Sequence, residues 1–156
     1  MIIPKIYLET TIFNFYFDTD RDAYADTVKL FKEIKAGKYK AYTSTYVTKE
    51  LEAAPEPKCS KMMKLISDYN IAVLAPSDEA AVLAQKYIAS GIIPEKYQAD
   101  ALHIAVASVN SLDMIISMNF QHIVKRKTKL ATESINLLSS YRSIEILTPM
   151  EVIENE

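Results

Sequence analysis

Three carboxylates lie where a parallel α/β sheet positions its ligands, beyond the carboxyl ends of strands and near helix starts. Asp100 opens the segment 100–107, which is apolar almost all round and is predicted to be a buried helix. Glu9 ends the apolar stretch 6–8, and Glu50 lies one or two turns into another predicted helix. A charged group in such surroundings needs a cation, a hydrogen-bond partner or water. The helix dipole contributes only ~0.3–1 kcal/mol, so a metal ion explains Asp100 better.

Gathered carboxylates repel one another, and a hard divalent cation with oxygen ligands relieves the repulsion. The sequence therefore predicts Mg²⁺ (or Mn²⁺) as the cofactor, held by Glu9, Glu50 and Asp100. One such ion polarises a phosphate and activates water, and a pair ~3.5–4 Å apart also stabilises the leaving oxygen. Polar neighbours can orient the ligands or bind water, and these are Thr10, Thr11 and Asn119.

Each carboxylate also has a simpler interpretation. Asp100 is a favoured residue type for a helix N-cap. Glu9 is equally consistent with a strand-end acid that pairs with Lys5 or Arg21, and Glu50 with a solvated helix residue. Taken together, the ordered acids favour the ligand interpretation for Asp100 and Glu9, while Glu50 stays open between the two.

The two histidines and one basic run flank these acids. His103 shares a helix face with Asp100 and is predicted to be a core histidine bonded to the backbone, with a ligand or general-base role as the alternative. His122 is predicted to pack a turn, with a contact to substrate as the alternative. A basic run follows the fourth predicted strand and consists of Lys125, Arg126, Lys127 and Lys129. It is interpreted either as a solvated loop or as a binding surface for RNA phosphates.

Composition excludes several classes of protein. The chain has 156 residues, 49% hydrophobic and 24% charged, with a net charge of −2, which fits one globular domain over 1–156 and not a globally basic coat protein. No apolar run approaches the ~18 residues of a membrane span. The lone Cys59 cannot form an internal disulfide, so a cytoplasmic location is expected. The two glycines, Gly37 and Gly91, each follow a helical pattern and are predicted to end helices, so they cannot form a glycine-rich phosphate loop.

Strand and helix patterns alternate along the chain. Strands are predicted over 5–9, 39–43, 71–74, 113–117 and 144–147. Helices are predicted over 24–36, 45–53, 58–69, from Ser77 to Ser90, from Asp100 onward, over 129–139, and briefly from Pro149. Because the central strands are apolar on both faces, we expect an α/β fold with a mostly parallel sheet covered by helices on both sides.

These residues carry a family resemblance. The segments 7–13, 49–51, 100–105 and 113–123, with the tail 144–152, resemble PIN-domain proteins of the VapC-type toxin group. The resemblance spans nearly the whole chain. It implies a three-layer α/β/α sandwich and a metal-dependent ribonuclease site, with the family's acids at Glu9, Glu50 and Asp100. It also implies a homodimer and a cognate antitoxin as partner.

The chain departs from the family pattern at two positions. Glu9 stands where the family has aspartate, and Asn119 stands where a fourth acid often follows. Despite these two departures, the resemblance implies an endoribonuclease, the toxin of a toxin–antitoxin pair, that hydrolyses RNA through a metal-activated water. The alternative is a catalytically impaired PIN-like domain that binds RNA or protein. A phosphohydrolase with an aspartyl nucleophile is disfavoured, because the first strand lacks paired aspartates.

Overall fold

The computed structural model describes residues 2–153. Within them, five strands form one sheet in the order β3-β2-β1-β4-β5, and every neighbouring pair is parallel. The strands are β1 (Lys5–Leu8), β2 (Lys40–Ser44), β3 (Ala72–Leu74), β4 (Met114–Ile116) and β5 (Glu145–Leu147). The five predicted strands are confirmed, each within one or two residues of its expected ends.

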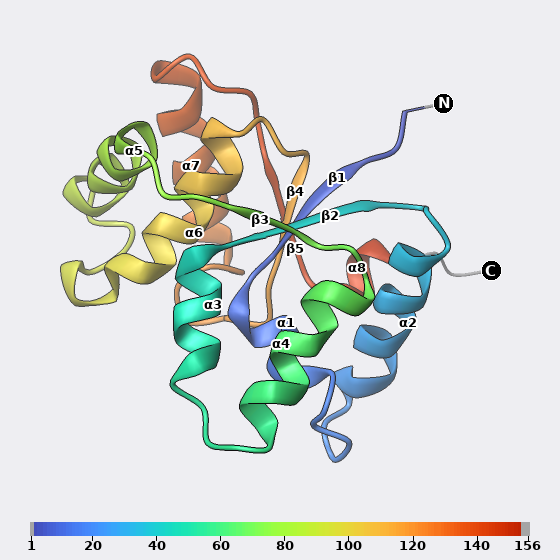
Figure 1. Cartoon of the computed structure of the whole chain (residues 1–156). Coiled ribbons are helices and arrows are strands. Elements are labelled where there is room, and N and C mark those ends of the chain that lie inside the picture. Colours follow the sequence, from blue (N-terminus) through green and yellow to red (C-terminus); the bar gives the residue numbers. More distant parts are fainter. Residues whose placement is uncertain (1, 154–156) are drawn as a thin grey trace.

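Helices cover both faces of the sheet, as Figure 1 shows. One face carries α1 (Thr10–Phe15), α2 (Ala23–Lys35), α4 (Lys58–Asp68) and α8 (Pro149–Val152). The other carries α5 (Asp78–Ala89), α6 (Gln98–Val109) and α7 (Arg126–Leu138). Helix α3 (Thr45–Glu52) contacts α1, α4 and α6, so it lies between the two layers. The predicted three-layer sandwich is therefore confirmed.

Local chemistry fixes the ends of several helices. Gly37 and Gly91 have φ of +85° and +82° and follow α2 and α5, which matches the prediction that both glycines stop helices. The Ser77 side chain accepts a hydrogen bond from the backbone N–H of Ala80 at the start of α5, as predicted. No helix within residues 2–153 is long and apolar enough to cross a membrane.

The sheet and α6 supply the centre of the core. Ile6, Tyr7 and Leu8 of β1 are fully buried, as expected for a central strand with helices on both faces. In α6, Ala101 and residues 103–108 are buried, which explains why the helix is apolar almost all round.

Three features differ from the predictions. Helix α1 was not expected, because the β-branched and aromatic residues of Thr10–Phe15 favour strand over helix. Burial of Ile12 and Phe13 against the core overrides that preference. The short 3₁₀ helix η1 (Glu95–Tyr97) was also missed, and α7 begins at Arg126, three residues before the predicted start. The basic run consequently lies on the first turn of a helix and not in a loop.

Candidate active site

The carboxyl ends of β1 and β4 lie side by side where the strand order changes direction. Leu8 pairs with Ile116, and the backbone N–H of Glu9 donates to the carbonyl oxygen of Ile116 at 3.1 Å. The next residues, Glu9 and Ser117, therefore emerge together at this edge. The chain leaves β1 toward β2 and leaves β4 toward β5, which makes the edge the usual position for a ligand in an open parallel sheet.

The Glu9 carboxylate is held in one orientation by two hydroxyl groups. Its Oε1 accepts hydrogen bonds from Thr11 Oγ1 and from Ser117 Oγ, each at 2.6 Å, and Glu9 is only 3% exposed. Both hydroxyls are fixed in turn by the loop after β4. Thr11 Oγ1 accepts from the backbone N–H of Met118 at 2.8 Å, and Ser117 Oγ accepts from that of Asn119 at 2.9 Å. Glu9 is therefore oriented before any ligand arrives.

Asp100 lies in the first turn of α6, opposite the same loop. Its Oδ1 accepts a hydrogen bond from the Asn119 side-chain amide at 3.2 Å. The amide oxygen of Asn119 is already committed, because it accepts from the backbone N–H groups of Gln121 and His122 at 3.2 and 3.1 Å. Asn119 thus orients Asp100 and shapes the turn, while its oxygen is not free for the water-binding or ligand role predicted from the sequence.

Burial raises the pKa of the Asp100 carboxyl, and the negative charge of Glu9 raises it further. The charges of His103 and His122 and the Asn119 hydrogen bond lower it, without cancelling the rise. The negative charge of Glu9 therefore disfavours the ionised form of Asp100, which means that the two carboxylates repel each other.

Glu50 takes part in a chain of polar side chains that runs into the core. His103 Nε2 donates to Glu50 Oε1 at 2.6 Å, and Thr10 Oγ1 donates to the same oxygen at 2.9 Å. The other ring nitrogen, Nδ1, lies 2.7 Å from the Tyr7 hydroxyl, which lies 2.7 Å from Ser44 Oγ. His103 is buried as predicted, but the prediction of a backbone partner is wrong, because both ring nitrogens contact side chains.

The pKa shifts of this chain agree with its hydrogen bonds. Burial disfavours the charged forms of both Glu50 and His103, but their mutual hydrogen bond and opposite charges outweigh it. The pKa of Glu50 is consequently lowered and that of His103 raised, so the pair favours carboxylate and imidazolium. Burial raises the pKa of Tyr7, whose hydroxyl remains neutral between Ser44 and His103.

The three predicted acids lie near one another at the carboxyl edge of the sheet, but only Glu50 contacts His103 directly. The charges of Glu9, Glu50 and Asp100 each act on His103, although the acids come from the end of β1, from α3 and from α6. Within residues 2–153, however, no three His, Cys, Asp or Glu side chains lie close enough together to hold one metal ion. The acids therefore divide into the pair Glu9 and Asp100 and the His103-bound Glu50.

The remaining predicted residues occupy distinct places. Thr11 orients Glu9, whereas Thr10 orients Glu50. Within residues 2–153, Glu9 does not pair with Lys5 or Arg21, because its carboxylate bonds to the hydroxyls of Thr11 and Ser117 while Arg21 pairs with Asp18 at 3.3 Å. In the basic run, Arg126 and Lys127 are exposed and Lys125 and Lys129 are half-buried, all near the start of α7.

Sequence reasoning missed Ser117 and Tyr7 as parts of the site. Ser117 could have been found, because it follows β4 just as Glu9 follows β1, and parallel strands place such residues side by side. Tyr7 had no comparable indication, since a tyrosine inside a buried strand is an ordinary core residue.

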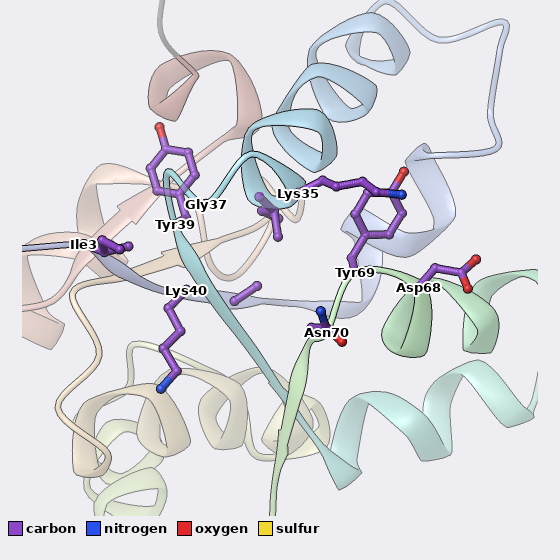
Figure 2. Close-up of a pocket in the computed structure, with 10 residues that line it drawn as sticks. Ile3, Lys35, Gly37, Tyr39, Lys40, Asp68, Tyr69 and Asn70 are labelled. Carbon is purple, nitrogen blue, oxygen red and sulfur yellow. The ribbon is translucent and has the colours of Figure 1, made fainter.

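Neither of two sizeable cavities is lined by these acids. One, of about 620 Å³, lies at the opposite edge of the sheet beside Lys40 and Ala41, where Figure 2 shows Lys35 next to the ring of Tyr69. The other, of about 470 Å³, is lined by apolar side chains such as Phe15 and Met118 and by the charged residues Arg21, Asp22 and Asp26. The chemistry of the side chains, and not cavity size, therefore identifies the acidic edge as the candidate site.

Comparison with known proteins gives a structural match. No family model matches the sequence, and no curated protein sequence matches it. The fold is similar to a chain in the crystal structure of VapBC2 from Rickettsia felis bound to a DNA fragment from their promoter, with a TM-score of 0.57 and 13% sequence identity. The match covers 92% of this chain and 98% of that chain. The fold is thus PIN-like, as the resemblance predicted.

Proposed function

We propose that the protein is a metal-dependent endoribonuclease that hydrolyses RNA phosphodiester bonds. The observation that carries the proposal is that one hydrogen-bonded loop after β4, through Ser117 and Asn119, links Glu9 to Asp100 at the carboxyl edge of the sheet. Carboxylates concentrated at such an edge serve metal-assisted phosphoryl chemistry.

The donor chemistry of Glu9 and Asp100 fits Mg²⁺ or Mn²⁺. Both ions prefer carboxylate oxygens, and a bound cation would stabilise the ionised form of Asp100, whose pKa is raised by burial and by the charge of Glu9. Glu9 and Asp100 would hold the ion, while the carboxylate of Glu50 is balanced by the His103 imidazolium. When bound, the ion supplies a polarised phosphate and an activated water.

The chain's own residues prepare this chemistry. Thr11 and Ser117 fix Glu9, and Asn119 fixes Asp100, so neither carboxylate has to reorient when ligand binds. The exposed Arg126 and Lys127 near the start of α7 bind the RNA backbone, for which a protein with a net charge of −2 needs a local basic patch.

We further propose that the protein is the toxin of a toxin–antitoxin pair, a homodimer that binds a cognate antitoxin. The PIN-like fold and its similarity to a chain of a VapBC2 structure support this assignment. Size-exclusion chromatography with light scattering tests the dimer, and co-purification with the product of the adjacent gene tests the antitoxin.

Cleavage of a mixed RNA pool in Mn²⁺, Mg²⁺ or EDTA tests the enzymatic function. Wild type should cut RNA with a divalent ion and not in EDTA, and Asp100→Asn should not cut. Asp113→Asn is the matched control, because Asp113 contacts Lys5 and Arg142 away from the acidic edge. Equal cutting by the wild type and the Asp100→Asn variant would contradict the proposal.

The observed geometry also favours a second candidate, a PIN-like domain that binds RNA without cutting it. Glu50 is engaged by His103 and Thr10, and residues 2–153 contain no three-residue metal cluster. Undiminished RNA binding by a folded protein that cuts nothing with either ion would select this candidate.

A further inference from the structure

Both ring nitrogens of His122 are buried and have no hydrogen-bond partner within residues 2–153. The residue is 8% exposed, and its imidazole stacks on the ring of Tyr97 with centroids 4.1 Å apart. A buried polar atom without a partner destabilises a fold, so such a group in a native protein needs a reason. The prediction that His122 packs a turn accounts for its backbone, which bonds to Asn119, but not for its nitrogens.

His122 lies beside the candidate active site. Tyr97 immediately precedes α6, and Asp100 lies in the first turn of that helix. Asn119 links the two residues, because its amide nitrogen donates to Asp100 Oδ1 at 3.2 Å and its amide oxygen accepts from the backbone N–H of His122 at 3.1 Å. A strand of RNA that places a phosphate at Asp100 therefore passes close to His122.

The chain after His122 is arranged for an anion. Thr128 Oγ1 donates to the carbonyl oxygen of His122 at 2.8 Å, which ties the first turn of α7 to this residue. Lys125 makes no side-chain cap bond, and the first turn of α7, all of it described, contains no acidic residue. Helix N-termini favour anions, whereas cations such as Arg126 and Lys127 are unfavourable there unless an anion compensates them.

We propose that His122 is a substrate-binding residue, which donates a hydrogen bond from its imidazole to a phosphate oxygen of the RNA strand that lies across Asp100. The inference rests on the nuclease function proposed above and names one of its substrate contacts. An imidazole carries at least one N–H in either protonation state, so the contact does not require a particular charge on His122. Because the ring of Tyr97 stacks on the imidazole in the free protein, RNA binding has to part the two rings.

The chain has only two histidines, so the imidazole nitrogens can be observed directly by ¹⁵N NMR. His122→Phe assigns the spectrum and keeps a ring against Tyr97 while it removes both nitrogens. On addition of a single-stranded oligoribonucleotide in EDTA, the His122 signals of the wild type should move. Fluorescence polarisation should show RNA affinity about tenfold lower for His122→Phe, the loss expected for one hydrogen bond to a charged group.

A purely structural role predicts a different pattern. If His122 binds substrate, His122→Phe should have a melting temperature no lower than that of the wild type, because it removes two unsatisfied polar atoms, whereas a structural role predicts a lower one. Tyr141→Phe is the control, because it removes only a hydroxyl contact with Glu79. RNA that binds wild type and His122→Phe equally and leaves the His122 signals in place would overturn the inference while RNA binding stands. If His122→Phe does not fold, His122→Gln assigns the two histidine signals in its place, so the NMR result on wild type still decides the question.

A different set of results would contradict the proposed nuclease function itself, and not only the His122 contact. If neither wild type in EDTA nor Asp100→Asn in Mg²⁺ binds RNA, and wild type cuts none, then the nuclease proposal and the His122 contact both fall.

Discussion

The pair of His103 and Glu50 can be measured as a coupling energy. His103→Ala removes a fully buried imidazole and its bonds to Glu50 Oε1 at 2.6 Å and to the Tyr7 hydroxyl at 2.7 Å. The Tyr7 bond contributes about 1 kcal/mol and the cavity costs about 1–3 kcal/mol. The charged bond contributes about 1 kcal/mol once it is reduced for solvent screening, because the Glu50 side chain is 41% exposed. The free energy of unfolding should therefore fall by about 3–5 kcal/mol.

The double-mutant cycle isolates the shared interaction. Glu50→Gln keeps an acceptor for His103 but removes the charge, and should lower the free energy of unfolding by about 1 kcal/mol. The coupling between His103→Ala and Glu50→Gln, measured by urea unfolding in EDTA, should be about 1 kcal/mol.

The coupling should also depend on pH. The pKa of His103 is raised, so its stabilisation is complete below the ordinary value of 6.5 and is lost as the pH rises through the folded-state value. The pKa of Glu50 is lowered, so its stabilisation is complete above the ordinary value of 4.5 and is lost as the pH falls through the folded-state value. The coupling should be largest between these values, near pH 5.5, and smaller at pH 8.5. A coupling that is absent at pH 5.5, or equal at both pH values, would refute the reasoning.

Three further predictions concern two other buried hydrogen bonds and the proposed metal site. Ser117→Ala removes one of the two hydroxyl donors to Glu9, so it should lower the free energy of unfolding by about 1–2 kcal/mol in urea titration and reduce cleavage by more than its effect on folding explains. Tyr87→Phe leaves the buried Asn136 Oδ1 without its hydroxyl donor, and should cost about 1–3 kcal/mol of stability with unchanged affinity for Mn²⁺. Mn²⁺ at about a hundredfold excess over its Kd should raise the free energy of unfolding by about 2.7 kcal/mol in thermal denaturation, an effect that EDTA should abolish and Asp100→Asn should reduce to about 1.4 kcal/mol or less.

The fold could be predicted from the sequence because its signals are local and repeated. Strands such as Ile6–Leu8 are apolar at every position, and Gly37 and Ser77 mark helix ends by their own chemistry. Helix α1 could not be predicted in this way, since Thr10–Phe15 is helical through burial in the finished core and against its intrinsic preference.

The candidate site was only partly predictable for a related reason. The segments around Glu9 and Asp100 are distinctive enough to single out those acids. The partner of each acid depends on pairing between distant strands and helices. The contact of His103 with Glu50 spans 53 residues, and that of Ser117 with Glu9 spans 108. The Ser117–Glu9 contact could have been inferred from two parallel strands that end side by side, but no spacing along the chain indicates the His103–Glu50 contact.

The proposed nuclease function depends most on the claim that Glu9 and Asp100 bind a metal ion. Isothermal titration with Mn²⁺ tests it directly, on wild type, Asp100→Asn and the control Asp113→Asn. Wild type and Asp113→Asn should bind Mn²⁺ saturably, and Asp100→Asn should bind Mn²⁺ at least tenfold more weakly. Equal Mn²⁺ affinity in all three proteins, or no binding by folded wild type, would contradict it.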